Sequence, residues 1–372
     1  MKKFFPALTL LSLLTFACAQ TTPQTPPTLD TVPEASPTFD IQPSTESPDT
    51  AYISFIVNVH DWTHPDESAD ILLQLVDLFE RYGVRGDFYF TAEITRELAE
   101  NHPEVIERFR NSNMTVSYHV RPPHPLYTGF DSRLQNLNDE ALHQTLLDYE
   151  TYALNLETGE LDKSQPGGYA YVAQIFGRNP VVVPAPNSGK VKDAAQKVYA
   201  GLGAQMTLLY HEEGTNLEQP FEYVNGLLVR PSDFGVTRTT FVDGKDSFWW
   251  NFMSTPEADK YNPTKMLQDQ LTEWVGRIGN PTYRAPFITA LIHENNFYRS
   301  GAEGWTSIYF EMNGAKKGNP LSAPWDLSAA DPSRPRSEAD KQAIFAAYEE
   351  MVAYAAANLN VVTSEDIIEL AK

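Results

Sequence analysis

Histidine and aspartate side chains stand at the ends of several short apolar runs in this sequence. His60 ends the run AYISFIVNVH and is followed by Asp61, His119 ends MTVSYH, and His293 ends FITALIH. His124 follows His119 within YHVRPPHP, where two prolines prevent a regular helix, so a turn must bring this pair together. Two imidazoles and one carboxylate suit a divalent catalytic metal that keeps one position open for water or substrate.

The elements that must position these side chains alternate between β and α patterns. Helices between short strands indicate parallel strands joined by right-handed crossovers. The number of such units fits an α/β fold, a (β/α) barrel with loop insertions, better than an open sheet, and the carboxyl ends of barrel strands carry active sites. We predict strands at 51–60, 86–92, 114–119, 180–184, 205–211, 287–293 and 360–364, and helices at 67–82, 95–110, 191–201, 337–357 and 365–371. Pro103 is expected to break the 95–110 helix or to start a new one.

Composition excludes several classes of protein. The 372 residues carry 28 Lys+Arg against 49 Asp+Glu, a formal charge of −21, which argues against nucleic-acid binding. With 42% hydrophobic and 21% charged residues, most of the chain is expected to fold. The single cysteine excludes a disulfide scaffold.

The N-terminal segment has the pattern of an export signal. Two lysines precede the apolar run 4–17, which is too short to span a bilayer. We therefore predict a signal peptide at 1–18, with Cys18 as the lipidated residue of a bacterial lipoprotein; an ordinary cleaved signal is the alternative. Residues 19–50, rich in Pro, Thr and Ser, are predicted to be a tether, and 51–372 the folded domain. These features indicate an exported protein of the cell envelope that contacts the membrane only through its lipid anchor, or one that is periplasmic or secreted.

Five stretches resemble, in order and spacing, the motifs of the polysaccharide deacetylase family, also called NodB-homology or carbohydrate esterase family four. They are SFIVNVHDW, GVRGDFYFTAE, VSYHVRPPH, LIHENNF and NVVTSEDIIEL. The resemblance implies a distorted (β/α) barrel and a divalent metal, usually zinc, held by Asp61, His119 and His124. It also implies hydrolysis of an acetamido group on a sugar, with His293 as the acid.

The sequence departs from the family pattern at three places. Where the family has a catalytic aspartate as base, this chain offers His60 or, two places earlier, Asn58. His60 is the better local candidate, because an unperturbed imidazole pKa of about 6.5 suits a general base. The histidine pair has four intervening residues instead of three, and VPAPNSG (183–189) takes the place of an arginine-x-proline motif without an arginine. Arg284 lies too close to His293 for the usual order.

The sequence therefore predicts a metal-dependent hydrolase that removes acetyl groups from an N- or O-acetylated polysaccharide or peptidoglycan-like glycan of the cell envelope. The departures keep two alternatives open: a catalytically impaired barrel that binds glycan, and a metal hydrolase for another C–N or glycosidic bond. Glu294 follows His293, and strand alternation predicts that its side chain points away from the site. Tryptophans that could stack on sugars or fill the core are Trp62, Trp249, Trp250 and Trp305.

Overall fold

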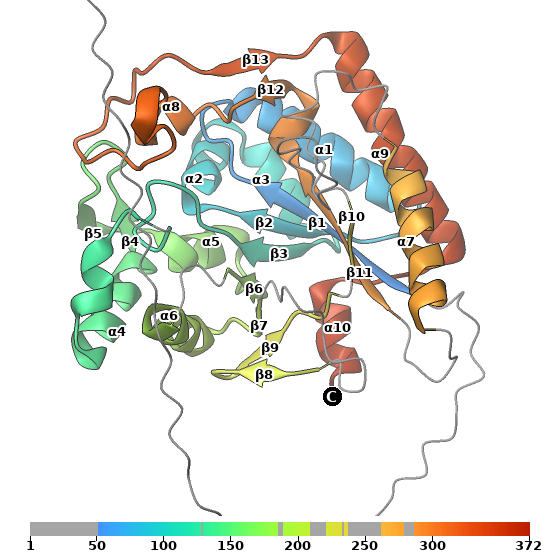
Figure 1. Cartoon of the computed structure of the whole chain (residues 1–372), viewed down its shortest axis with the longest axis horizontal. Helices are drawn as coiled ribbons and strands as arrows, with labels where there is room; N and C mark the ends of the chain where they lie inside the picture. Colours follow the sequence, from blue (N-terminus) through green and yellow to red (C-terminus); the bar gives the residue numbers. More distant parts are fainter. Residues whose placement is uncertain are drawn as a thin grey trace, which may run out of the picture. The chain divides into compact units, whose positions relative to one another are not determined.

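The computed structural model describes most of the chain from residue 51 onward (Figure 1). The predicted signal segment 1–18, with Cys18, and the predicted tether 19–50 lie outside the described residues, so both stay predictions. Trp249, Trp250 and Arg284 also lie outside them. The described residues are 51–127, 129–184, 189–208, 221–232, 234–236, 262–278 and 286–372.

The first part of the domain alternates strands and helices as predicted. Strand β1 pairs in parallel with β2, and β2 pairs in parallel with β3. Within the helical stretch predicted at 95–110, Pro103 begins a new helix as predicted, at its first position, where a proline needs no backbone donor. The bounds are β1 Tyr52–Val59, α1 Pro65–Arg81, β2 Asp87–Phe90, α2 Ala92–Asn101, α3 Pro103–Arg110 and β3 Thr115–Tyr118.

Helix α1 illustrates how the local sequence produces this pattern. Leu72, Val76 and Phe79 recur at helical spacing and are buried, so they form one apolar stripe that faces the sheet. The chain leaves the helix through Gly83, whose φ of +66° lies in the left-handed region that favours glycine. Phe79 then packs against Phe88 of β2, with 5.9 Å between the ring centroids.

The remaining parallel strands continue the same path around the domain. Strands β6, β7 and β9 pair in parallel, and the backbone N–H of Val181 donates to the carbonyl of Val116, which joins this group to β3. Strand β10 pairs in parallel with β11, and β11 pairs with β1. The predicted α/β fold, a distorted (β/α) barrel, is therefore confirmed. The bounds are β6 Val182–Val183, α6 Gly189–Leu202, β7 Met206–Thr207, β9 Leu227–Val229, β10 Phe234–Val236 and β11 Phe287–His293.

Further elements are inserted between the barrel units or follow them. They include the hairpin β4–β5, the antiparallel pair β12–β13, and the short β14, which pairs with β1 near the end of the chain. None of the helices in the described ranges is long and apolar enough to cross a membrane. The bounds are η2 Ser132–Asn136, α4 Asp139–Tyr149, β4 Tyr152–Leu154, β5 Leu161–Pro166, α5 Gly168–Phe176, β8 Tyr223–Val224, α7 Pro263–Ile278, η4 Glu294–Phe297, β12 Arg299–Gly301, α8 Thr306–Tyr309, η5 Gly314–Lys316, β13 Ser333–Pro335, α9 Glu338–Asn358, β14 Asn360–Val361 and α10 Ser364–Leu370.

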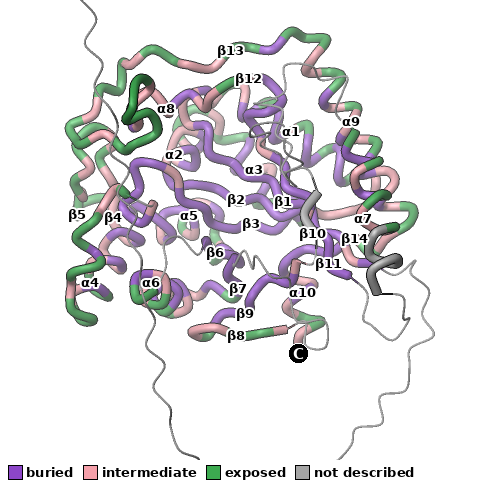
Figure 2. Tube along the Cα trace, in the orientation of Figure 1, coloured by how far each residue is buried: buried purple, intermediate pink, exposed green. Residues whose placement is uncertain are grey.

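The barrel strands form the buried centre of the domain, with the exposed residues on the helices and the inserted hairpins (Figure 2). Every residue of β1 except Tyr52 is buried. Strands that are covered on both faces read as continuous apolar runs, which is why this strand could be recognised from its sequence.

A buried ion pair ties three distant parts of the chain together at the amino end of β2. The Arg230 Nη1 atom lies 3.0 Å from Asp87 Oδ2, and it also donates to the hydroxyl oxygen of Ser364. Asp87 in turn accepts a hydrogen bond from the backbone N–H of Ser364, at 3.0 Å, at the start of α10. Both charged side chains are almost completely buried, at 2% and 0% exposure. Their separation would leave a desolvated charge without its main partner.

The first prediction concerns this ion pair. The substitution Asp87→Ala should lower the free energy of unfolding by about 3–5 kcal/mol, because the buried Arg230 charge then loses its carboxylate. Urea denaturation of the full chain, followed by circular dichroism, measures this change. Arg108→Ala, which removes a largely exposed pair with Glu80 and Asp77, is the control and should cost about 1 kcal/mol or less. A loss in Asp87→Ala no larger than in the control would contradict the prediction.

Candidate functional site

Three of the predicted histidines lie together at the carboxyl end of the parallel sheet. In the register of β1 with β11, Asn58 is opposite His293, and His60 follows just beyond it. The His60 ring lies 5.2 Å from the His293 ring and 6.2 Å from the ring of His119, which follows β3. The Nδ2 atom of Asn58 lies 3.3 Å from Nε2 of His293, which is hydrogen-bonding distance. The parallel pairing alone thus brings together residues that are far apart in the sequence.

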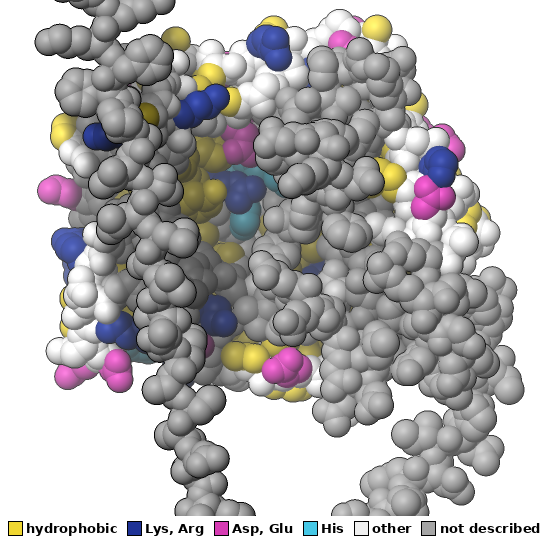
Figure 3. All heavy atoms as spheres, viewed as in Figure 1, with side chains coloured by type: hydrophobic (Ala, Val, Ile, Leu, Met, Phe, Trp, Pro, Cys, Tyr) yellow, Lys and Arg dark blue, Asp and Glu magenta, His cyan; other side chains and the backbone are white. Residues whose placement is uncertain are grey.

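A carboxylate that was not predicted completes this group. Oε1 of Glu303 lies 3.0 Å from Nε2 of His60. Burial by itself would raise the pKa of Glu303, but His60, Arg121 and His293 outweigh it and lower the pKa to about 2, so this carboxylate is ionised. Figure 3 shows histidine side chains next to basic and acidic ones, beside a patch of hydrophobic side chains.

Gly304 is the residue that lets Glu303 approach His60. A Cβ atom at position 304 would lie 2.2 Å from Oγ1 of Thr63 and 2.8 Å from Cε1 of His64. Both distances are far below van der Waals contact, and both neighbours are held by hydrogen bonds to Asp61. Any larger residue at this position would therefore push the 303–305 segment away from His60.

Glu294 fixes the backbone of the His60 loop through two hydrogen bonds. Its Oε1 accepts hydrogen bonds from the backbone N–H of His60, at 2.6 Å, and of Asp61, at 2.7 Å. Burial is the main cause that raises the pKa of Glu294. Strand alternation does not govern its direction, because β11 ends at His293 and the 3-10 helix η4 begins at Glu294. Glu294 therefore holds the backbone of the His60 loop in position.

Asp61 belongs to a second cluster beside the first. Its Oδ2 accepts from the hydroxyl of Tyr298, at 3.2 Å, and lies 2.9 Å from Nδ1 of His64, while its Oδ1 accepts from Thr63. Nε2 of His64 lies 2.9 Å from Oδ2 of Asp331, so the imidazole bridges two carboxylates. Three of the roughly four lone-pair sites of the Asp61 carboxylate are thus used by neighbouring groups.

His124 lies in a third environment. Its Nδ1 accepts from the backbone N–H of Leu126, at 3.2 Å, which assigns the ring proton to Nε2. That Nε2 lies 3.5 Å from both the hydroxyl of Tyr118 and Oε1 of Glu150. Burial lowers the pKa of His124 to about 3, so the ring is neutral at pH 7. Both of its nitrogens face groups other than the His60 cluster.

The structure therefore gathers a different set of metal donors from the one implied by the resemblance. Among the described residues, the donor atoms of His60, His293 and Glu303 lie within 4.8 Å of one another, and this group could hold a metal ion. His119 lies beside it, whereas Asp61 and His124 are held in the two other clusters. We refer to His60, His293 and Glu303 as the His–His–Glu group.

Glu303 and Arg121 could not be selected from the sequence. Glu303 lies in the irregular segment SGAEGW, without an apolar run or a motif on either side. The only sequence signal is its neighbour Gly304, and a glycine in a loop has many explanations. Arg121 lies in the turn between the predicted ligands His119 and His124, and the sequence does not show which way its side chain points.

Solved structures with a similar fold include polysaccharide deacetylases, the family that the sequence resembles. One is a putative polysaccharide deacetylase from Mycobacterium smegmatis, with 13% identity, coverage of 88% of this chain and 92% of that chain, and a TM-score of 0.47. Another is a probable polysaccharide deacetylase from Pseudomonas aeruginosa PAO1, with 13% identity, 86% and 91% coverage, and a TM-score of 0.43. A third is PuuE allantoinase, with 12% identity, 89% and 93% coverage, and a TM-score of 0.45.

No protein-family model and no curated protein matches this chain. At these identities and TM-scores, the solved structures say nothing about the activity of this chain, so its chemistry has to be argued from its own side chains.

The second prediction concerns the imidazole that bridges two carboxylates. Burial by itself would lower the pKa of His64, but the hydrogen bond and charge of Asp61, with the hydrogen bond of Asp331, raise it above the usual 6.5. This interaction stabilises the fold fully below pH 6.5, and the stabilisation is lost as the pH rises through the folded-state pKa. His64→Ala should therefore cost more stability at pH 6 than at pH 9, with a loss of about 1–3 kcal/mol at pH 6.

Urea denaturation of both proteins at the two pH values measures this difference. The control is His143→Ala, because His143 is exposed on α4 and should give the same small change at both pH values. An equal loss at pH 6 and pH 9 for His64→Ala would show that Asp61 and Asp331 do not favour the charged imidazole.

Proposed function

We propose that this chain is a metal-dependent hydrolase that removes acetyl groups from an N- or O-acetylated glycan. The observation that carries the proposal is the His–His–Glu group at the carboxyl ends of β1 and β11, where a (β/α) barrel holds its active site. Two imidazoles with one carboxylate are a donor set used by catalytic zinc sites.

The residues of this group fit a divalent metal. Glu303 is ionised, as a ligand must be, since nearby groups lower its pKa to about 2. Nδ1 of His60 is buried and makes no hydrogen bond within the described part of the chain, so the ring is not committed to protein partners on both sides. When bound, a divalent metal, which we propose to be zinc, would polarise the acyl carbonyl and lower the pKa of water.

If the metal is held by other residues, the same side chains can instead perform the acid–base roles predicted from the sequence. The Glu303 carboxylate, 3.0 Å from Nε2 of His60, would orient that ring and stabilise its protonated form, as a carboxylate does for a histidine base. His293, held by Asn58, would then donate a proton to the leaving group. A His60 nitrogen that binds metal cannot also accept a proton from water. Metal analysis therefore distinguishes His60 as a metal ligand from His60 as a base.

A glycan-binding barrel without catalysis is the second candidate function. It is favoured by the hydrogen bonds that Asp61 and His124 make to other partners, because those partners would compete with a metal ion for the same atoms. Asn58 also occupies a place where a carboxylate base could stand. This candidate predicts glycan binding with neither stoichiometric metal nor acetate release.

The proposed site of action is the cell envelope. This proposal is supported by the predicted signal segment 1–18, by Cys18 as a lipidation site and by the Pro-rich tether 19–50. An anchored enzyme on such a tether could reach a polysaccharide or peptidoglycan-like substrate near the membrane surface.

The third prediction concerns metal binding. The purified full chain should bind about one zinc ion, and Glu303→Ala and His293→Ala should lose it because each removes one of three donors. His124→Gln should keep the ion, since His124 faces Leu126 and Glu150. Elemental analysis after dialysis measures the stoichiometry, and circular dichroism checks that each variant is folded.

Loss of zinc in His124→Gln with retention in Glu303→Ala would contradict this prediction and favour the ligand set of the resembled family. A wild-type chain that binds no zinc would rule out the metal-dependent reaction.

The fourth prediction concerns catalysis. Glu303→Gln should lower the rate of acetate release from N-acetylglucosamine oligomers or peptidoglycan fragments by about 10²–10⁴-fold, whether Glu303 binds metal or orients His60. Gly304→Ala should also lower it, because the added methyl displaces Glu303. An enzyme-coupled acetate assay measures both rates.

Glu338→Gln is the matched control, since Glu338 is exposed on α9 and should leave the rate unchanged. Equal rates for Glu303→Gln and the wild type would remove the His–His–Glu group from the reaction.

A further inference from the structure

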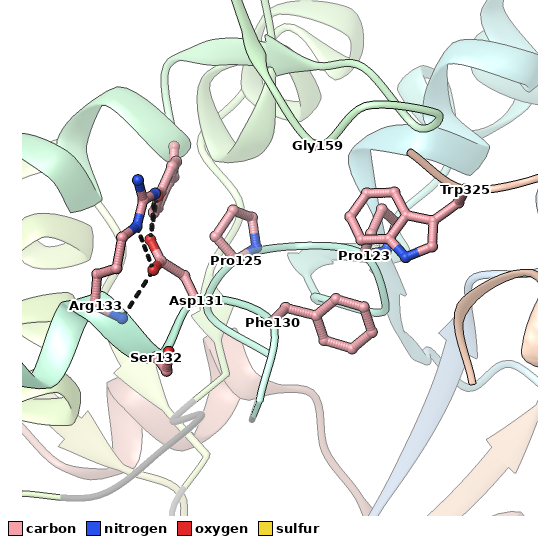
Figure 4. A pocket seen from close by; sticks show the side chains of 9 residues that line it. Pro123, Pro125, Phe130, Asp131, Ser132, Arg133, Gly159 and Trp325 are labelled. Carbon is pink, nitrogen blue, oxygen red and sulfur yellow. Dashed lines mark hydrogen bonds and ion pairs between the residues drawn. The ribbon is translucent and has the colours of Figure 1, made fainter. Parts of the chain in front are cut away.

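A pocket lies beside the loop that carries His124, and its lining includes Pro123 and Pro125. It has a volume of about 290 Å³, near the small end of the range for ligand pockets. In Figure 4 its apolar residues Phe130 and Trp325 lie opposite the charged residues Asp131 and Arg133, with Pro125 between them. The pocket thus has one aromatic and one polar wall.

The Trp325 ring of the aromatic wall is held in place by neighbouring groups. The Trp325 ring packs against Tyr309, at 5.3 Å between centroids and 87° between planes, and against Phe130 at 6.1 Å. Its indole N–H donates to the carbonyl of Leu321, at 3.0 Å. Gly159 gives the ring its space, because a Cβ there would lie 2.9 Å from it. A ring fixed in this way loses little conformational entropy when a ligand stacks on it.

The polar wall carries no net charge. Nε and Nη2 of Arg133 donate to the two carboxylate oxygens of Asp131, at 2.9 and 3.0 Å, and Tyr149 donates to the same carboxylate at 2.6 Å. Burial by itself would raise the pKa of Asp131, but Arg133 and Tyr149 lower it below its usual value, so the carboxylate is ionised and paired. The Arg133 side chain is 80% exposed, so its remaining N–H groups can reach a ligand. A paired charge favours a neutral, hydroxyl-bearing ligand over an anion.

An aromatic cluster joins this pocket to the candidate active site. Tyr309 packs against Trp325 on one side and against Trp62 on the other, at 6.3 Å between centroids. Trp62 directly follows the His60 loop, and Trp305, in the same cluster, directly follows Gly304. This cluster, in which Tyr309 and Trp305 are buried, therefore packs between the pocket and the residues beside the His–His–Glu group.

We infer that this pocket binds one neutral sugar ring of the glycan substrate, stacked on Trp325 and hydrogen-bonded by Arg133, while another unit of the same chain lies at the His–His–Glu group. An apolar aromatic face opposite polar side chains matches a sugar ring, which has C–H groups on its faces and hydroxyl groups at its rim. The inference rests on the proposed function for the role of the second site, but the binding itself does not require catalysis.

Calorimetric titration of the full chain with the tetrasaccharides of N-acetylglucosamine and of glucose tests the inference. Trp325→Ala should weaken binding of the tetrasaccharide about fivefold, since aromatic stacking contributes about 1 kcal/mol and 1.4 kcal/mol is tenfold. Arg133→Ala should weaken it several-fold, and circular dichroism checks that this variant is folded. Leu327→Ala is the matched control, because Leu327 is exposed on the same loop and outside the pocket.

Unchanged affinity in both Trp325→Ala and Arg133→Ala, an equal loss in Leu327→Ala, or no binding of either tetrasaccharide by the wild type would overturn the inference. Glu303→Gln separates it from the proposed function, because this variant should bind the tetrasaccharide normally while it loses acetate release. If the wild type binds the sugar through Trp325 and releases no acetate, the pocket stands and the proposed catalysis fails.

Discussion

The parallel pairing of β1 with β11 is the constraint on which the candidate site depends. It sets Asn58 opposite His293 and places His60 at the same edge, although 233 positions separate these two histidines (293 − 60 = 233). Strand register alone brings the two histidines together, so no specific side-chain contact is needed to place them. The loop that follows β12 then adds Glu303, and the missing side chain of Gly304 allows the close approach. The geometry of the site is thus a consequence of backbone pairing and one close loop contact.

Three carboxylates around the His60 loop have different roles because their surroundings differ. Glu294 is buried against backbone N–H groups and anchors the loop, with a pKa raised by burial. Asp61 is engaged by Thr63, His64 and Tyr298. Glu303 faces imidazoles and Arg121, which keep it ionised and available to an ion or a proton-transfer partner. Residue type alone would make all three equal candidates for chemistry.

The sequence allowed the barrel and part of the site to be predicted. Buried strands such as β1 and β11 are continuous apolar runs, so their positions and the residues at their ends could be identified. Glu303 could not, because it comes from an irregular loop whose path depends on the pairing of β12 with the distant β13. The side-chain directions of Asp61 and His124 could not either, since they follow from partners as distant as Tyr298 and Glu150. The same limit applies to Trp325, whose pocket forms only when three separate loops meet.

A crystal structure of the full chain grown with zinc, with anomalous scattering recorded at the zinc edge, tests the central claim most directly. The account predicts one anomalous peak bonded to the side chains of His60, His293 and Glu303. A peak bonded to Asp61, His119 and His124, or no peak near the His60 loop, would contradict it.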